Sequence, residues 1–522
     1  MNRKFKPYIS FFINSIAMKL KNYLFGLCLT GMLFALSSCN KTPKSVSMID
    51  DESFMVLRFD VKQLAEKSGV SDDKDFKEKM DKMLKESGLS KKAADAVKDI
   101  MEDPVKMGVD LRDPVFVSMK VVTEKNEWGE YQGVEPEIIG TIFDAGDFAE
   151  FVNIISKENG GDEVVEKDGI RCLASHGTAL IFDDDSFILT GVDSEDDAEA
   201  VIKDFKGRFE GKDGGKMAEN ENFLAMCERP GAAQFLLFGD KFYKNIDASQ
   251  KEVLKDLKGM DLLFDLEMNK GEAVVTGEPL FTTEEAKKKH DKSLEMIGDI
   301  SGDYAPYLSK EFFGIFANID GAKFYEALEE VPDFKEMKSE IPFDLKKVLG
   351  SIKGDVALGA NQLDIADNQF GGALYISTPS NDFFDTVTGM LKEQGAPMTE
   401  AGTNCYSLNL GYEGPSVQFG LDKKSTFVAL SSSTPEPFKN DKNAFSKSDI
   451  KGRGFYAFFN FKTLKKLPLS GEEEMVAKEV VKLFDYAECY YDKDNKGVLR
   501  VVSNDKDKNI LELIVDLIKE YA

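Results

Sequence analysis

The chain carries an internal repeat, and this repeat constrains the possible fold more than any other feature. Each half opens with an apolar strand that leads into a helix, at residues 54–60 in the first half and 313–320 in the second. In the middle of each half, a strand precedes an amphipathic helix, at 138–143 and at 371–376. Because the modules keep their order along the chain, we predict two tandem, duplicated domains.

The strands and helices of each half indicate the α+β class. Late in each half, Asn and Gly stand at a tight reversal, at 269–271 and at 495–497, and these are hairpin signals. Strand pairs without regular β-α-β alternation predict antiparallel sheets covered by helices. We place the first α+β repeat domain at 51–300 and the second at 301–522; two generic α+β domains that only resemble each other remain the alternative.

Residues 1–38 have the layout of a lipoprotein signal peptide, with Met18 as a second candidate for the true start. Lys19 and Lys21 precede an apolar run at 23–35, which is shorter than the about 20 residues of a membrane span. A span remains the alternative. The run ends in a lipobox, which consists of Leu36, Ser37, Ser38 and Cys39. We predict cleavage before Cys39 and acylation of this cysteine, with palmitate among its chains.

The segment after the cleavage site and the net charge limit the partners of the mature chain. Residues 39–50 are predicted to be a lipid-anchored polar tether without secondary structure. Removal of residues 1–38 removes five basic residues and no acidic one, which changes the net charge from −26 to −31. Such a charge opposes binding to nucleic acid and to anionic headgroups. We therefore expect no nucleic-acid partner, and contact with the membrane through the acyl chains on Cys39.

Few residues suit metal or nucleophilic chemistry. The chain has only two histidines and no zinc-binding motif, so we name no catalytic residue and expect no cofactor. Asp492 and Asp494 resemble the start of a calcium-binding loop and are weak metal candidates. Lys496 and Ser503 stand where that motif requires an oxygen donor and a bidentate glutamate, so a hairpin turn is the favoured interpretation.

Two aromatic residues and four cysteines leave alternatives open. Trp128 and Tyr131 are candidates for stacking on a ligand, although a role in covering the core is the simpler interpretation. The four cysteines after the anchor are expected to be buried thiols, but the sequence does not exclude disulfides. They are Cys172, Cys227, Cys405 and Cys489.

The lipobox, the opening strand and helix at 56–69 and the two-copy layout together resemble a family of uncharacterised Bacteroidetes lipoproteins. This family carries a domain of unknown function, of the family 4836 type. Surface lipoproteins of that phylum tend to have acidic residues directly after the acylated cysteine, whereas Lys41 and Lys44 stand here. The resemblance therefore implies an outer-membrane anchor that faces the periplasm, and it supplies no catalytic residues.

These observations predict a non-enzymatic binding or assembly module of the cell envelope. Its partner would be an envelope protein or an apolar ligand such as a lipid. The alternative is a periplasmic hydrolase that depends on carboxylates or a metal. Matching apolar surfaces on both halves would favour binding, and a conserved acidic cluster in the cleft of one half would favour the enzyme.

Overall fold

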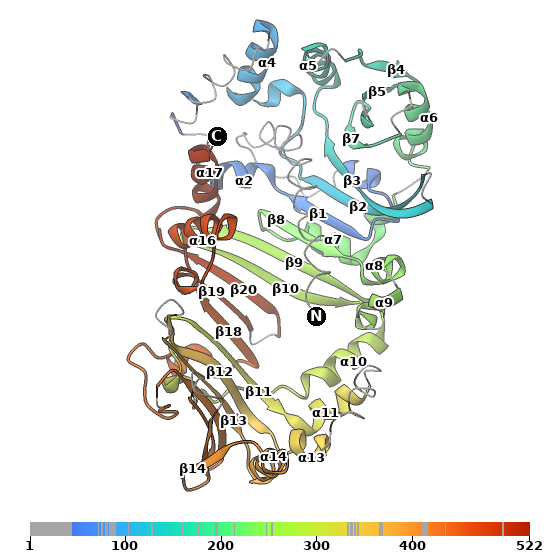
Figure 1. The fold of residues 1–522 in the computed structure, drawn as a ribbon. Coiled ribbons are helices and arrows are strands. Elements are labelled where there is room, and N and C mark those ends of the chain that lie inside the picture. The colour runs from blue at the N-terminus through green and yellow to red at the C-terminus, as the bar shows by residue number, and fades with distance from the viewer. Residues whose placement is uncertain are drawn as a thin grey trace. The chain divides into compact units, whose positions relative to one another are not determined.

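The computed structural model divides the chain into two compact units (Figure 1). Unit 1 contains the chain up to Lys270 together with Lys508–Ala522, and unit 2 contains Gly271–Asp507. The predicted boundary between residues 300 and 301 stays a prediction. The structure describes residues 44–521 apart from 71–72, 75–76, 79–81, 83–89, 103, 127–128, 159–160, 176, 194–196, 213–214, 247, 252–253, 331–333, 335–337, 339–340, 342–343, 365–368, 410–415, 434 and 493–494.

Unit 1 is built on an antiparallel sheet in the order β4-β5-β6-β7-β3-β2-β1-β8-β9. Its strands are β1 (Met55–Phe59), β2 (Val115–Asn126), β3 (Gly129–Thr141), β4 (Val165–Lys167), β5 (Ile170–Ser175), β6 (Thr178–Phe182), β7 (Ser186–Gly191), β8 (Ala233–Leu237) and β9 (Met260–Asn269). Its helices are η1 (Lys44–Met48), α2 (Val61–Ser68), α4 (Lys91–Glu102), η3 (Pro104–Met107), α5 (Ala145–Glu158), α6 (Ala198–Phe209), η4 (Lys216–Glu219), α7 (Glu221–Cys227), α8 (Gly239–Asn245), α9 (Ala248–Lys251), η5 (Lys255–Leu257) and α17 (Ile510–Tyr521).

Unit 2 is also built on an antiparallel sheet, in the order β14-β15-β16-β17-β13-β12-β11-β18-β19-β20-β10. Its strands are β10 (Glu272–Phe281), β11 (Phe313–Asp320), β12 (Lys353–Asp364), β13 (Gln369–Ser377), β14 (Met398–Gly402), β15 (Cys405–Asn409), β16 (Ser416–Asp422), β17 (Ser425–Ser431), β18 (Phe455–Asn460), β19 (Phe484–Tyr491) and β20 (Gly497–Ser503). Its helices are α10 (Glu284–Leu294), η6 (Ala305–Tyr307), α11 (Gly321–Glu329), α13 (Leu345–Gly350), α14 (Asp382–Glu393), α15 (Lys447–Ile450), η7 (Phe461–Lys466) and α16 (Glu472–Leu483).

The two sheets share one strand order. If ten is added to each strand number of unit 1, the order β4-β5-β6-β7-β3-β2-β1-β8-β9 becomes β14-β15-β16-β17-β13-β12-β11-β18-β19. This is the order observed in unit 2, to which β20 and β10 are added at one edge. The opening helices also begin alike: Asp60 caps α2 and Asp320 caps α11, each by accepting backbone N–H groups of the first turn. The predicted α+β class with antiparallel sheets and helices is confirmed. A common ancestry of the two units stays a prediction.

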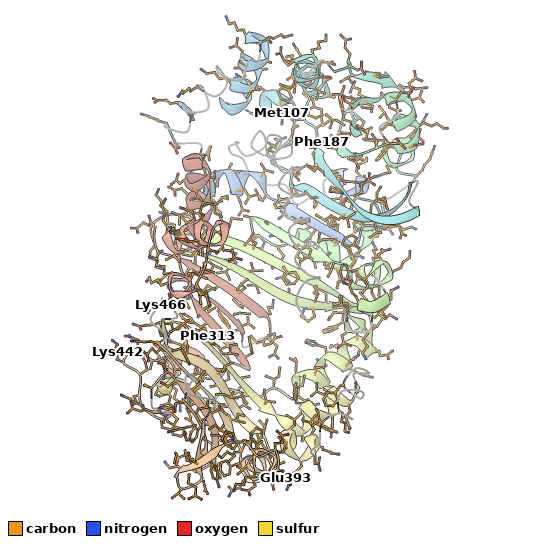
Figure 2. The ribbon with its side chains drawn as sticks, in the orientation of Figure 1. Met107, Phe187, Phe313, Glu393, Lys442 and Lys466 are labelled. Atoms are coloured by element: carbon orange, nitrogen blue, oxygen red, sulfur yellow. The ribbon has the colours of Figure 1, made fainter. Side chains whose placement is uncertain are left out.

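Aromatic and aliphatic side chains fill separate cores in each unit. In unit 1, Met107 and Phe187, both labelled in Figure 2, belong to a core that α5 covers through Phe148 and Val152. In unit 2, Tyr375, Phe316 and Tyr456 lie at the centre of a core on one face of the sheet. In the part of the chain that the structure describes, no helix has the length and apolar character needed to cross a membrane.

Candidate functional site

The described chain begins inside the core of unit 1. Val46 and Ile49 are 0% exposed, and Ser45 and Met48 are also buried. The Ser45 hydroxyl accepts a hydrogen bond from the Thr141 hydroxyl of β3 at 3.1 Å. The prediction of a polar tether at 39–50 is therefore wrong for residues 44–50, because their apolar side chains are buried and η1 forms there.

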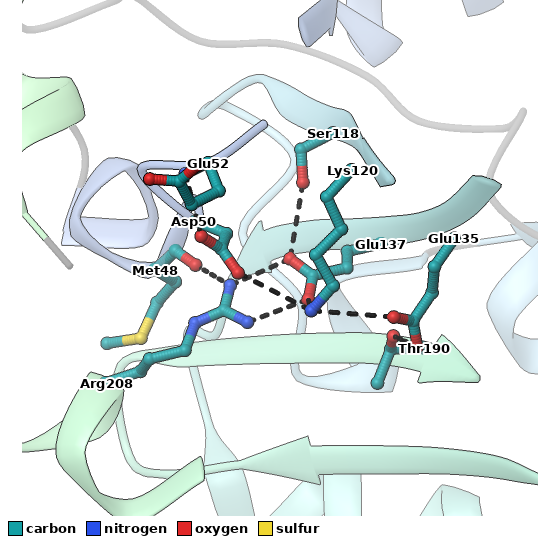
Figure 3. Close-up of polar contacts among 9 residues, drawn as sticks. All are labelled: Met48, Asp50, Glu52, Ser118, Lys120, Glu135, Glu137, Thr190 and Arg208. Atoms are coloured by element: carbon teal, nitrogen blue, oxygen red, sulfur yellow. Dashed lines mark hydrogen bonds and ion pairs between the residues drawn. The ribbon is translucent and has the colours of Figure 1, made fainter. Parts of the chain in front are cut away.

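A network of charges with a buried centre holds this first segment in place (Figure 3). Arg208 of α6 donates to both carboxylate oxygens of Glu137, at 2.8 and 2.9 Å, and Glu137 is only 1% exposed. The same guanidinium also donates to the Met48 carbonyl, just after the start of the described chain. Arg208 of α6 and Glu137 of β3, which are far apart in the sequence, are thereby joined to the end of η1.

Lys120 of β2 completes the network. Its ammonium group lies 3.1 Å from Glu137 and 3.5 Å from both Asp50 and Glu135. Burial opposes ionisation of Glu137, but hydrogen bonds and charges from Arg208 and Lys120 outweigh it, so the pKa of Glu137 is lowered. The cations and carboxylates pair with one another, and among the polar atoms of these described side chains only Nε of Arg208 is buried without a hydrogen bond. Loss of either side of such a pair leaves a charge uncompensated, so the network holds these segments together.

One face of the unit 2 sheet is apolar across seven strands. The central row of paired residues consists of Leu374, Leu358, Ile315, Ala457, Cys489, Leu499 and Val275. Since side chains alternate along a strand, one flanking row on each side of the central row shares this face. The first flanking row consists of Gly372, Ala360, Phe313 (labelled in Figure 2), Phe459, Ala487, Val501 and Ala273. The second consists of Ile376, Val356, Ala317, Phe455, Tyr491, Gly497 and Gly277. No position in the three rows carries a charged side chain.

Part of this apolar face is exposed. Helix α14 packs at its β17 end, where Val428 lies beside Val387 and Leu391. Farther along the face, Ile315 is 39% exposed, Leu358 42% and Leu499 43%. Large, contiguous apolar surfaces of this kind are rare on monomeric proteins unless something binds to them.

Unit 1 has a matching apolar face that is better covered. Its central row consists of Ile138, Val117, Leu57, Phe235 and Phe264, and each of these residues is half-buried. One flanking row consists of Pro136, Met119, Met55, Leu237 and Leu262. The other consists of Gly140, Val115, Phe59, Ala233 and Leu266. The described residues thus carry matching apolar faces in both units.

The opposite face of the unit 2 sheet carries a polar pocket of about 400 Å³ beside the β18, β19 and β20 strands. Its lining residues are Lys310, Asp449, Arg453, Tyr456, Phe458, Asn460, Asp485, Tyr486, Glu488 and Arg500. Glu488 accepts hydrogen bonds from the Tyr456 hydroxyl at 2.9 Å and from Arg500 at 3.2 Å. Burial, together with the charge of Glu488, raises the pKa of Tyr456, so this phenol stays protonated at neutral pH.

The predicted lipidation residues and half of each weak candidate pair lie outside the described residues. These are Leu36, Ser37, Ser38, Cys39, Trp128 and Asp494. The backbone of Tyr131 lies in β3 opposite Glu124. The Asp492 carboxylate accepts a hydrogen bond from the Lys496 backbone at 2.9 Å, in the turn between β19 and β20, so the favoured interpretation of a hairpin turn is confirmed.

The four cysteines of the described chain are free thiols. Cys172 is buried as expected, and desolvation raises the pKa of this thiol to about 12. Cys227 and Cys405 are only partly buried, and Cys489 is exposed on the apolar face of unit 2, so the expectation of a buried thiol holds for Cys172 alone. Within the residues that the structure describes, no group of three or more His, Cys, Asp or Glu side chains is arranged to hold a metal ion.

The pocket had no recognisable signal in the sequence. Arg453, Glu488 and Arg500 are ordinary charged residues in a chain with 31% charged residues. Only the antiparallel pairing of β18, β19 and β20 brings Glu488 and Arg500 near Arg453, which lies in the loop before β18. The apolar faces did have a signal, because the nearly uninterrupted apolar runs at 313–317 and 455–459 indicate strands that are apolar on both faces.

Comparisons with known proteins give a family and one structural similarity. A family model described as a domain of unknown function (DUF4836) matches residues 46–429. Among solved structures, crystal form I of TP0453 matches with 12% identity and a TM-score of 0.25, covering 50% of this chain and 88% of that one. A search of curated proteins finds no match.

Proposed function

We propose that this chain, which belongs to the family of the domain of unknown function DUF4836, is a lipid-anchored, non-enzymatic binding protein of the bacterial envelope. The family supplies no activity, so the proposal depends on residues of this chain. The observation that carries it is the partly exposed apolar face of unit 2, with Ile315, Leu358 and Leu499 at its centre.

The anchor is proposed from the lipobox that ends at Cys39. Because Val46 belongs to the core of unit 1, only the residues from Cys39 to Lys44 remain as a link. These six residues are joined by five Cα–Cα steps, which reach at most about 18 Å. An acylated Cys39 would therefore keep unit 1 very close to the membrane, on the periplasmic side of the outer membrane if Lys41 and Lys44 have the meaning inferred above.

Replacing Cys39 by serine is expected to abolish lipid attachment. A serine has no thiol to receive the diacylglyceryl group, so cells fed an alkyne analogue of palmitate should label the wild-type protein and not Cys39→Ser. The variant should also leave the membrane fraction. Labelling of Cys39→Ser at the wild-type level would refute the anchor, and cleavage of the wild type by protease added to intact cells would refute the periplasmic orientation.

The occupant that best fits the apolar face is a lipid acyl chain. The three rows offer almost no hydrogen-bonding side chains, so an extended peptide lying there would leave its own N–H and C=O groups without partners. A second copy is disfavoured because each mature chain carries a net charge of about −31, and such charges repel. An acyl chain requires neither hydrogen bonds nor charge.

The alternative of a carboxylate-dependent hydrolase receives less support. The carboxylates of the unit 2 pocket already have cationic partners: Glu488 is held by Arg500 at 3.2 Å and Asp485 by Lys462 at 2.9 Å. A general base needs access to the proton that it removes. The matching apolar faces favour binding instead.

Fatty-acid binding tests the function. The full chain with Cys39→Ser, which carries no acyl anchor to compete, is titrated with cis-parinaric acid, whose fluorescence rises in apolar surroundings. The double variant Ile315→Gln/Leu358→Gln should bind roughly tenfold more weakly or worse, since burial of each such side chain contributes about 1.5–3 kcal/mol.

The matched control lies in the same unit. Met475 and Val476 of α16 are exposed apolar residues outside the three rows. Met475→Gln/Val476→Gln should bind as the wild type does. Equal affinity of all three proteins would contradict the site, and failure of the wild type to bind the probe would contradict acyl-chain binding.

A further inference from the structure

We propose that the polar pocket of unit 2 binds a small hydroxylated carboxylate, such as a sugar acid, and that Arg453 contacts the carboxylate group of this ligand. The inference is independent of acyl-chain binding, because Tyr456 of the pocket and Ala457 of the apolar face point to opposite sides of β18. The volume of about 400 Å³ lies within the range of about 300–1,000 Å³ that small-molecule sites occupy.

The charges of the pocket leave one arginine without a carboxylate. Lys310 is paired with Asp449, and Arg500 is held by Glu488 at 3.2 Å and by Glu272 at 2.6 Å. Among the described residues, Arg453 has no ion-pair partner, and one of its terminal nitrogens is buried without a hydrogen bond. An uncompensated cation in the wall of a pocket favours an anionic ligand.

Aromatic rings fix the orientation of this arginine. The guanidinium carbon of Arg453 lies 3.6 Å from the ring centre of Tyr490 and 4.9 Å from that of Tyr456. A guanidinium that stacks by its face keeps N–H groups at its edge, and such an edge matches the two oxygens of a carboxylate. Tyr486, Asn460 and Asp449 also line the pocket, where their polar atoms would meet the hydroxyl groups of such a ligand.

In unit 1, an arginine at a similar place, in the loop before the corresponding strand, forms an ion pair with a carboxylate of the protein. The loop before β8 carries Arg229, whose guanidinium lies 3.7 Å from the carboxylate of Asp265. Asp265 stands opposite Gln234 of β8, whereas in unit 2 Tyr490 stands opposite Tyr456 of β18. We infer that in unit 2 the carboxylate of a ligand pairs with Arg453, as the carboxylate of Asp265 pairs with Arg229 in unit 1.

Calorimetry with a charged sugar and its neutral counterpart tests this inference. The full chain is titrated with D-glucuronate and, separately, with D-glucose. We expect D-glucuronate to bind in the millimolar range or tighter, and D-glucose to bind at least about tenfold more weakly, because it lacks the group that Arg453 contacts.

Two arginine variants separate the site from general effects of charge. Arg453→Gln should lose D-glucuronate binding by at least about tenfold, while Arg229→Gln should keep it. Circular dichroism verifies that both variants are folded. Absence of D-glucuronate binding to the wild type at millimolar concentration, equal binding of D-glucose, or unchanged binding by Arg453→Gln would each overturn the inference. None of these results would affect the parinaric acid experiment on the opposite face.

Discussion

Replacing Arg208 by methionine is expected to lower the free energy of unfolding of unit 1 by about 3–5 kcal/mol, the usual result of removing one partner from a buried ion pair. Methionine keeps much of the packing volume but removes both bonds to Glu137 and the bond to the Met48 carbonyl. Glu137 would then remain buried with Lys120 as its cation. Urea unfolding followed by circular dichroism measures the loss.

The same substitution at an exposed arginine provides the control. Arg112 pairs with Asp110 at 2.5 Å, but its side chain is 54% exposed, so solvent screens the interaction. Arg112→Met should cost less than about 1 kcal/mol. If Arg208→Met were no more harmful than Arg112→Met, the network around Glu137 would not be the element that stabilises the start of the chain.

Removing the first described segment is expected to have a still larger effect. A chain that begins at Ser53 lacks Val46, Met48 and Ile49, and each buried apolar side chain contributes about 1.5–3 kcal/mol. The sum, about 4.5–9 kcal/mol, approaches the whole stability of a domain. Unit 1 should then fail to fold, which hydrogen exchange detected by mass spectrometry would show as loss of protection in β1, β2 and β3.

A chain that begins at Lys44 is the control for this truncation. It keeps η1 and all the contacts of Ser45, Val46 and Met48, so protection in unit 1 should match that of the full chain. Full protection in the chain that begins at Ser53 would mean that the segment merely lies on unit 1 and contributes nothing to its stability.

The sequence sufficed for the fold class because local signals are strong in this chain. The apolar run at 54–59 followed by a capping Asp60 predicts a strand and a helix, and both are present as β1 and α2. The reversal at Asn495 contains a left-handed residue, with φ of 59°, as a tight hairpin requires. Such features depend on neighbours in sequence and can be read without a structure.

The candidate sites depend on pairing between distant strands, and the sequence does not specify this pairing. Arg453 becomes notable only because β19 places Tyr490, rather than a carboxylate, beside it. The predicted tether was wrong for a related reason. Val46 and Ile49 are too few to show a periodic pattern, yet the space that they fill in unit 1 buries them completely.

The assignment of α17 to unit 1 sets the order in which the protein can be completed after synthesis. Asn509, just before this helix, donates its side-chain N–H to the Met268 carbonyl at 2.8 Å, and all of unit 2 lies between these residues in the chain. A chain synthesised from its N-terminus contains all of unit 2 before α17 is added. Unit 1 therefore cannot be completed until all of unit 2 has been synthesised.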